Sequence, residues 1–224
     1  MKESRLILGL DGLSLEGAVE LVRRVKNRIW AVKIHNLFDE HGERANREVR
    51  EAGAPLVWDD LKLHDIPGTV GARAAAIKKC GADIVTVHAS GGVDMMKAAV
   101  DSGLTVFAVT VLTSLGYDQA KYIYGKSPAK AVKDLADMAK LAGVHGIVCS
   151  AEEVGDLSSL AATNEMELVV PGTRSPGKDK GDQKRSTTPG EAVSAGATKL
   201  VIASEVTKAS DPEAALENIE RQIT

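Results

Sequence analysis

The chain has 224 residues, of which 44% are hydrophobic and only 3% aromatic, and a formal net charge of −3 at neutral pH. This length suits one α/β-barrel domain over residues 1–224, and the slight negative charge argues against a nucleic-acid partner. The N-terminus has no signal-peptide pattern and no run approaches about 18 apolar residues, so we expect a cytoplasmic protein that does not contact a membrane.

Short apolar, β-branched runs alternate with helix-like stretches along the whole chain. Near-continuous apolar runs are typical of strands buried on both faces, as in a parallel sheet. The sequence predicts eight such strands, at 6–12, 30–35, 55–62, 83–89, 105–112, 146–150, 167–172 and 199–204. Eight strand–helix units favour a closed (β/α)₈ TIM barrel, and an open doubly wound sheet is the alternative.

Two of the intervening stretches illustrate the helical spacing. Residues 14–25 begin with a serine that can cap a helix, and a glutamate follows closely. Residues 131–143 end at a glycine, a common helix stop, and place most apolar side chains on one side: Val132, Leu135, Met138, Ala139 and Leu141. We expect Trp30 and Trp58 to pack between the barrel and its helices.

Polar and charged residues stand at the predicted carboxyl ends of the strands. Barrel enzymes have their active sites at this end. A single polar residue there is usually a solvated loop residue, but several that converge on one barrel mouth indicate a site. The residues are Asp11, Lys33, Asp60, Lys62, His88, Thr113, Ser150, Arg174 and Ser204.

The densest cluster is the run DDLKLHDIP at 59–67. Strand alternation predicts that Asp60 and Lys62 lie on the same side of the chain. A lysine between two aspartates stays an ammonium, because nearby anions favour its charged form. At about 4 Å and an effective dielectric near 20, each unit interaction is on the order of 4 kcal/mol. Such a cluster can hold a proton donor where negative charge develops, whereas a surface ion-pair strip would not follow so apolar a strand.

The run DLKLHDIPGT at 60–69 matches DxKxxDIPxT, the signature of orotidine 5′-phosphate decarboxylases, and the chain resembles this family over nearly its whole length. Other matching segments are LGLDG, AVKI, VTVHASGG, AVTVLTS, PGTR and GDQKR. These segments supply further candidate site residues, namely Asp11, Lys33, His88, Thr113, Arg174 and Gln183.

The resemblance implies decarboxylation of orotidine 5′-monophosphate to uridine 5′-monophosphate in pyrimidine biosynthesis, without a cofactor or a metal ion. Lys62 would protonate C6 of the pyrimidine as carbon dioxide leaves, and Asp60 would lie near the substrate carboxylate. Asp11 and Lys33 would contact the ribose hydroxyls, with Lys33 also in the charged network. A fixed cation that offers a proton stabilises the carbanion as it forms.

The resemblance also implies a homodimer with shared active sites. In the family, the second aspartate of the motif and the threonine after it reach the neighbouring subunit's site. Asp65 would therefore belong to the catalytic set, and Asp65 and Thr69 would act across the dimer interface.

The chain departs from the family pattern after the eighth predicted strand, where the family has Gly-Arg and the arginine binds the substrate phosphate. Ala203 and Ser204 stand there instead, followed by Glu205. A serine donates one neutral hydrogen bond, whereas an arginine offers a charged fork. Residues 173–186, with five basic and two acidic residues, can hold a phosphate in its place or can be a solvated charged loop.

Three functions therefore remain open. The first is the decarboxylase, and the second is a sugar-phosphate decarboxylase or aldolase of the same superfamily that uses magnesium, against which HDIPGT argues. The third is a binding protein, or a homologue with impaired phosphate capture, which Ser204 motivates and the intact Asp60, Lys62 and Asp65 oppose. The histidines show no metal-ligand spacing, and the two cysteines form no CxxC, as expected of free thiols in the cytosol.

Overall fold

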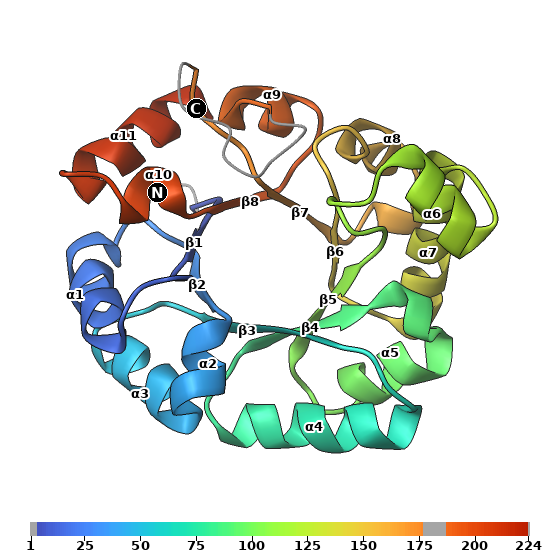
Figure 1. Ribbon diagram of the computed structural model, residues 1–224, viewed down its shortest axis with the longest axis horizontal. Helices are drawn as coiled ribbons and strands as arrows, with labels where there is room; N and C mark the ends of the chain where they lie inside the picture. Colours follow the sequence, from blue (N-terminus) through green and yellow to red (C-terminus); the bar gives the residue numbers. More distant parts are fainter. Residues whose placement is uncertain (1–3, 177–186, 224) are drawn as a thin grey trace.

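The computed structural model describes residues 4–176 and 187–223. Its eight strands pair in parallel, each with the next one in the chain, and β8 closes the ring against β1 (Figure 1). The strands are β1 Leu6–Gly9, β2 Ala31–Ile34, β3 Val57–Leu63, β4 Ile84–His88, β5 Thr105–Val109, β6 Gly146–Val148, β7 Glu167–Pro171 and β8 Lys199–Ile202. The closed ring confirms the (β/α)₈ barrel and contradicts the open sheet.

Every predicted strand is present, and each bound lies within three residues of the predicted one. Most strands end one to three residues earlier than predicted, so the last predicted residues, such as Asp11, lie in the loops that follow, whereas Lys33, Lys62 and His88 remain inside their strands. These loops all lie at the carboxyl ends of the strands, where the candidate site is expected.

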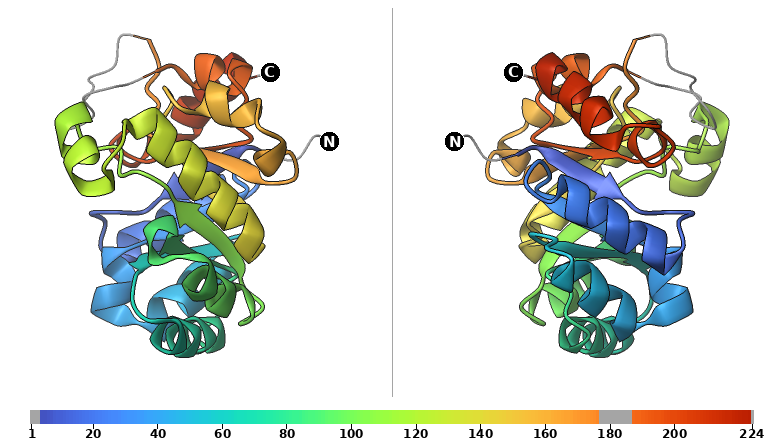
Figure 2. Two further views of the ribbon diagram at one scale, coloured as in Figure 1. Left: turned by 90° about the vertical axis from the view of Figure 1, so that its right-hand side faces the viewer. Right: turned by 90° about the vertical axis from the view of Figure 1, so that its left-hand side faces the viewer.

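Helices surround the ring of strands in all views (Figures 1 and 2). In the described ranges they are α1 Leu15–Val25, α2 Asn36–His41, α3 Glu43–Glu51, α4 Pro67–Lys79, α5 Val93–Val100, α6 Tyr117–Tyr124, α7 Pro128–Ala142, α8 Val154–Ser158, α9 Pro189–Ser194, α10 Ser204–Thr207 and α11 Pro212–Gln222, with 3₁₀ turns at Ala89–Gly91 and Ala161–Thr163. Among them, none is long and apolar enough to cross a membrane.

The two helices predicted in detail are present. The Ser14 side chain accepts a hydrogen bond from the Gly17 N–H and so caps α1, as its position predicts. In α7, Val132, Leu135 and Ala139 are buried. The prediction for Leu141 is wrong: its side chain is 75% exposed, because it lies on the solvent side of the helix.

Apolar side chains form two separate layers. The larger layer lies between the strands and the helices, and a smaller one fills the inside of the barrel around Trp58 and Phe107. The Trp58 ring meets the Phe107 ring edge-on at 5.2 Å, and Trp30 stacks on Phe107 at 6.4 Å. The prediction that both tryptophans pack between barrel and helices is therefore wrong, since they help to fill the interior below the polar strand ends.

Candidate active site

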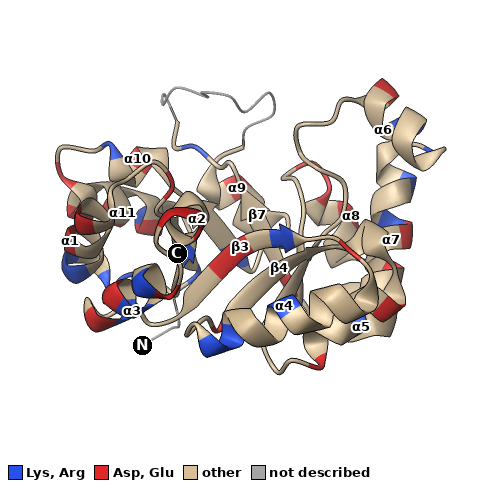
Figure 3. Cartoon of the chain, turned by 60° about the horizontal axis from the view of Figure 1, so that its bottom comes forward, with Lys and Arg blue, Asp and Glu red and all other residues tan. Residues whose placement is uncertain are grey.

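The Asp60 carboxylate is the centre of a charged network at the carboxyl ends of β1, β2 and β3. Its Oδ2 lies 2.8 Å from Nζ of Lys62 and 3.3 Å from Nζ of Lys33. The Lys33 ammonium also donates to Oδ2 of Asp11 at 2.8 Å. Two lysines and two aspartates therefore alternate in space, and the sequence predicted all four. Figure 3 shows the acidic and basic residues side by side along β3.

The second oxygen of Asp60 is held from the barrel interior. Thr86 on β4 donates its hydroxyl proton to Oδ1 of Asp60 at 2.7 Å, and Trp58 donates its indole N–H to the Thr86 hydroxyl oxygen at 2.7 Å. Both carboxylate oxygens are thus occupied, which fixes the orientation of Asp60. The sequence pattern does not identify Thr86 or this role of Trp58. The signal was available, because Thr86 is two residues before His88 and therefore faces the same side of its strand.

Charge compensation keeps the network ionised despite its burial. Asp60 and Lys33 are 6% and 7% exposed. Burial raises the pKa of Asp60, but Lys33 and Lys62 outweigh it, so the net pKa lies below the ordinary value for an aspartate. Burial lowers the pKa of Lys33, but Asp60 and Asp11 outweigh it and raise the pKa above the usual value for a lysine. Each buried charge therefore depends on its neighbours.

The backbone of β3 is irregular at the lysine. Its register against β4 shifts between Asp59 and Leu63, and Lys62 has a φ of 45°. Among the described residues no other non-glycine residue has a positive φ. Such a conformation costs about 1–3 kcal/mol and persists where the surrounding structure holds it, often at functional sites. The ion pair with Asp60 is one contact that holds Lys62 there.

A cavity of about 300 Å³ opens above this network. Its charged side is formed by Asp11, Lys33, Asp60 and Lys62, and Thr113, Arg174 and Ala203 also contribute to the wall, as the sequence predicted. Its other side is apolar, and the sequence did not single out these residues: Val109, Val111, Leu112, Val148, Pro171 and Val201. A cavity with one charged and one apolar wall suits a flat ring that carries polar substituents.

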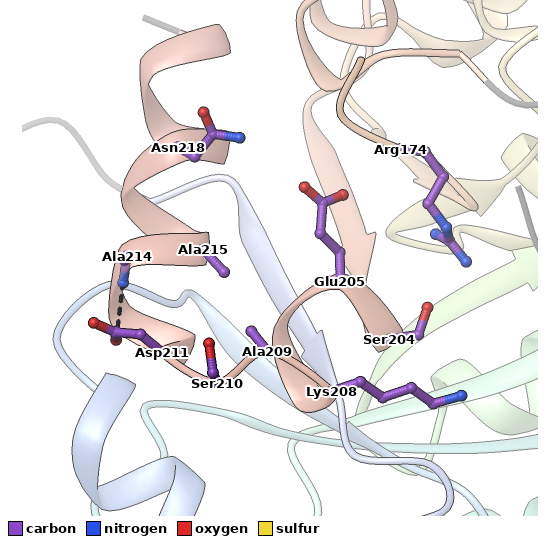
Figure 4. Close-up of a pocket in the computed structure, with 10 residues that line it drawn as sticks. All are labelled: Arg174, Ser204, Glu205, Lys208, Ala209, Ser210, Asp211, Ala214, Ala215 and Asn218. Atoms are coloured by element: carbon purple, nitrogen blue, oxygen red, sulfur yellow. Dashed lines mark hydrogen bonds between the residues drawn. The ribbon is translucent and has the colours of Figure 1, made fainter. Parts of the chain in front are cut away.

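Other predicted site residues lie apart from this cavity. His88 ends β4 with its ring 5.4 Å from that of His64, and burial lowers its pKa, which favours the neutral ring. Ser204 lines a neighbouring cavity of about 700 Å³, to which Arg174 also belongs (Figure 4). Gln183 and the basic residues Lys178, Lys180, Lys184 and Arg185 lie outside the described residues.

Asp65 and Thr69 are not gathered around Lys62 within one chain. Asp65 is exposed, accepts a hydrogen bond from the Ile66 N–H at 2.7 Å, and lines a separate surface hollow. Thr69 is partly exposed in the first turn of α4. Neither residue lines the cavity to which Lys62 belongs.

In the described part of the chain, no three histidine, cysteine, aspartate or glutamate side chains gather as metal ligands usually do. The chemistry that these residues can perform is that of a held ammonium beside a carboxylate: anion stabilisation and proton donation. A closed parallel barrel with such a network at the carboxyl ends of its strands defines a (β/α)₈ enzyme of the acid–base class.

The chain belongs to the orotidine 5′-phosphate decarboxylase / HUMPS family, whose model matches residues 4–219. It is 44% identical over 220 residues to the orotidine 5′-phosphate decarboxylase of Erythrobacter litoralis, with 96% of this chain and 97% of that protein covered. The Cutibacterium acnes enzyme of the same name is 39% identical, with 96% and 94% covered. Among solved structures, the Lactobacillus acidophilus orotidine 5′-phosphate decarboxylase gives a TM-score of 0.84 at 31% identity, with 99% of each chain covered.

Proposed function

We propose that this protein decarboxylates orotidine 5′-monophosphate to uridine 5′-monophosphate, a step of pyrimidine biosynthesis, with Lys62 as the proton donor. The observation that carries the proposal is the Lys62–Asp60–Lys33–Asp11 network beside a cavity with an apolar wall. The family and the names of the relatives supply the reaction. The network supplies the fixed cation and the proton donor that this reaction requires.

The reaction breaks the bond between C6 and its carboxylate carbon. The electron pair of this bond stays on C6, carbon dioxide leaves, and C6 takes a proton from the Lys62 ammonium, which then regains one from water. A carbanion at this position is very basic, so a cation fixed next to it lowers the barrier as charge develops. Asp60 keeps the ammonium in place, and Lys33, whose Nζ lies 3.3 Å from the same carboxylate oxygen, helps to keep Asp60 ionised.

The same network offers groups for the rest of the nucleoside. Asp11 is exposed at the cavity mouth, and Lys33 lies between it and Asp60, so both can bind ribose hydroxyls. The apolar wall across the cavity can contact the pyrimidine ring. Thr113 lines the same cavity and is a further proposed contact to the substrate.

A homodimer is part of the proposal. Asp65 and Thr69 lie on the surface, and the Ile66 side chain beside them is 69% exposed. In such a dimer Asp65 and Thr69 would complete the partner's site. We place the enzyme in the cytoplasm, where its free cysteines, Cys80 and Cys149, would stay reduced.

A spectrophotometric assay with orotidine 5′-monophosphate, without added metal, tests the proposed function. The product lacks the conjugated carboxylate, so turnover changes the ultraviolet absorbance. Chromatographic identification of uridine 5′-monophosphate and carbon dioxide in equal amounts confirms the reaction. Purified, folded protein that leaves this substrate unchanged would contradict the proposal.

A further inference from the structure

The phosphate of the substrate needs cationic partners, and this inference rests on the proposed function. A phosphate monoester carries close to two negative charges at neutral pH. In the central cavity, the ammonium groups of Lys33 and Lys62 are already paired with carboxylates. Arg174 also lines this cavity, and no carboxylate pairs with it among the residues that the structure describes. One uncommitted cation is insufficient for a dianion.

A second cation lies in the neighbouring cavity. Arg174 lines both cavities, so they meet at its side chain, and the second one is also lined by Ser204 and Lys208. The Lys208 N–H donates to the Ser204 carbonyl at 3.2 Å, which places the two residues one helical turn apart on the same side of α10. In Figure 4, Arg174 and Lys208 extend on either side of Ser204.

The two carboxylates of this cavity are turned to other partners. Oε2 of Glu205 accepts a hydrogen bond from the Ser175 N–H at 3.1 Å. Oδ1 of Asp211 accepts from the first N–H groups of α11 and lies 3.7 Å from Arg24. Lys208 is exposed, and within ranges 4–176 and 187–223 it pairs with no carboxylate. The cavity therefore presents two uncommitted cations and the hydroxyl groups of Ser204 and Ser210.

We propose that Lys208 binds the substrate phosphate together with Arg174 and the Ser204 hydroxyl. Lys208 thereby supplies, from one turn further along the chain, the charge that a serine at position 204 lacks. A lysine suits this task because its ammonium is a compact charge on a flexible stem and needs no fixed fork geometry. Lys208 is then a specificity-determining residue for phosphorylated substrates.

Kinetics with two substrates test this role. We would compare kcat/KM for orotidine 5′-monophosphate and for orotidine in the unchanged protein, Lys208→Ala, Lys208→Arg and Lys26→Ala. Lys26 is a matched control, since it is an exposed lysine after α1, at the opposite end of the barrel. Lys208→Ala is expected to lower kcat/KM for the phosphorylated substrate by roughly tenfold or more, and far less for orotidine, because a charge-assisted contact is lost. Lys208→Arg is expected to retain most of the activity.

Binding measurements separate this inference from the proposed function. Calorimetry would compare uridine 5′-monophosphate with uridine for the same four proteins, and Lys208→Ala is expected to weaken only the phosphorylated ligand. If the unchanged protein does not decarboxylate the nucleotide, the proposed function fails, and the binding comparison still decides the role of Lys208. If Lys208→Ala behaves like Lys26→Ala in both assays, or if the unchanged protein binds both ligands equally, the inference is wrong.

Discussion

Nζ of Lys62 lies 2.8 Å from Oδ2 of Asp60, two residues earlier on the same strand. Regular alternation does not produce this pair, because the register of β3 shifts here and Lys62 adopts a φ of 45°. The strained backbone points the ammonium into the cavity mouth, where its side chain is 32% exposed. A proton donor must be reachable by substrate, so this exposure matters as much as the ion pair.

Lys62→Ala is expected to lower kcat by roughly 10²–10⁴-fold or more, since it removes the proposed general acid. The melting temperature should change little, for two reasons. An alanine at position 62 has the same backbone strain at positive φ as the lysine, and Asp60 still forms its ion pair with Lys33. Steady-state kinetics and thermal denaturation measure the two effects. Near-normal turnover of the folded variant would remove Lys62 from the mechanism. In combination with Asp60→Asn the losses should be far from additive, because the two residues act as one unit.

Thr86→Val tests whether the interior hydrogen bond positions Asp60. Valine keeps the shape but removes the donor to Oδ1 of Asp60 and leaves the Trp58 N–H without its acceptor, which costs about 1–3 kcal/mol. We expect a lower kcat with a smaller change in KM. Thr105→Val on β5 is the control, since Thr105 lies at the start of its strand. Equal kinetics for the two variants would show that Thr86 has only a structural role.

Mixing inactive Lys62→Ala and Asp65→Ala subunits tests the proposed dimer. If Asp65 completes the partner's site, each heterodimer contains one site with both residues intact, and part of the activity returns. Subunit exchange would be verified with differently tagged chains and mass measurement. Absence of recovery after demonstrated exchange would argue that each site is built from one chain.

Asp59 is expected to make the protein less stable as the pH rises toward neutrality. It faces α3, is 0% exposed, and accepts one hydrogen bond from Asn46, while its Oδ1 has no partner. Burial raises its pKa from 3.8 to about 7. Between these values the folded state binds more protons than the unfolded state, so the free energy of unfolding falls as pH rises.

Asp59→Asn should therefore stabilise the protein at pH 8, on the order of a few kcal/mol, because one pKa unit corresponds to about 1.4 kcal/mol. The gain should shrink toward pH 5, where the aspartate is already protonated in the folded state. Urea denaturation at several pH values measures it, and the exposed Asp118→Asn serves as a control. A gain that did not depend on pH would show that burial of charge is not its cause.

The sequence predicted the barrel well because buried parallel strands have a strong apolar signal and are separated by clear helices. It predicted the charged network because Asp11, Lys33, Asp60 and Lys62 lie toward the carboxyl ends of three neighbouring predicted strands, and these ends meet in a closed barrel. It could not predict the φ of Lys62, since the bulge depends on how β3 and β4 pair. It also missed Thr86 and Lys208, because their importance comes from neighbours distant in sequence or one helical turn away.

Restoring an arginine at position 204 tests the origin of phosphate affinity most directly. Ser204→Arg is expected to raise kcat/KM for orotidine 5′-monophosphate by roughly tenfold to a hundredfold, because a charged fork replaces one neutral donor. Orotidine should gain little. The two positions line different cavities: Ser204 lines the 700 Å³ cavity that contains Lys208, whereas Ala203 lines the central cavity beside Lys62. Ala203→Gly with Ser204→Arg is therefore the cleaner variant, since it also removes a Cβ beside the substrate.

Introducing Ser204→Arg into the Lys208→Ala variant shows whether an arginine at position 204 and Lys208 both bind the substrate phosphate. If Lys208 covers for the absent arginine, Ser204→Arg should rescue the Lys208→Ala loss and add less to the unchanged protein than to this variant. Glu205 could capture the new guanidinium, but its Oε2 already accepts from the Ser175 N–H. If neither background responded, the side chain at position 204 would not reach the phosphate, and Arg174→Ala should still cause a large loss.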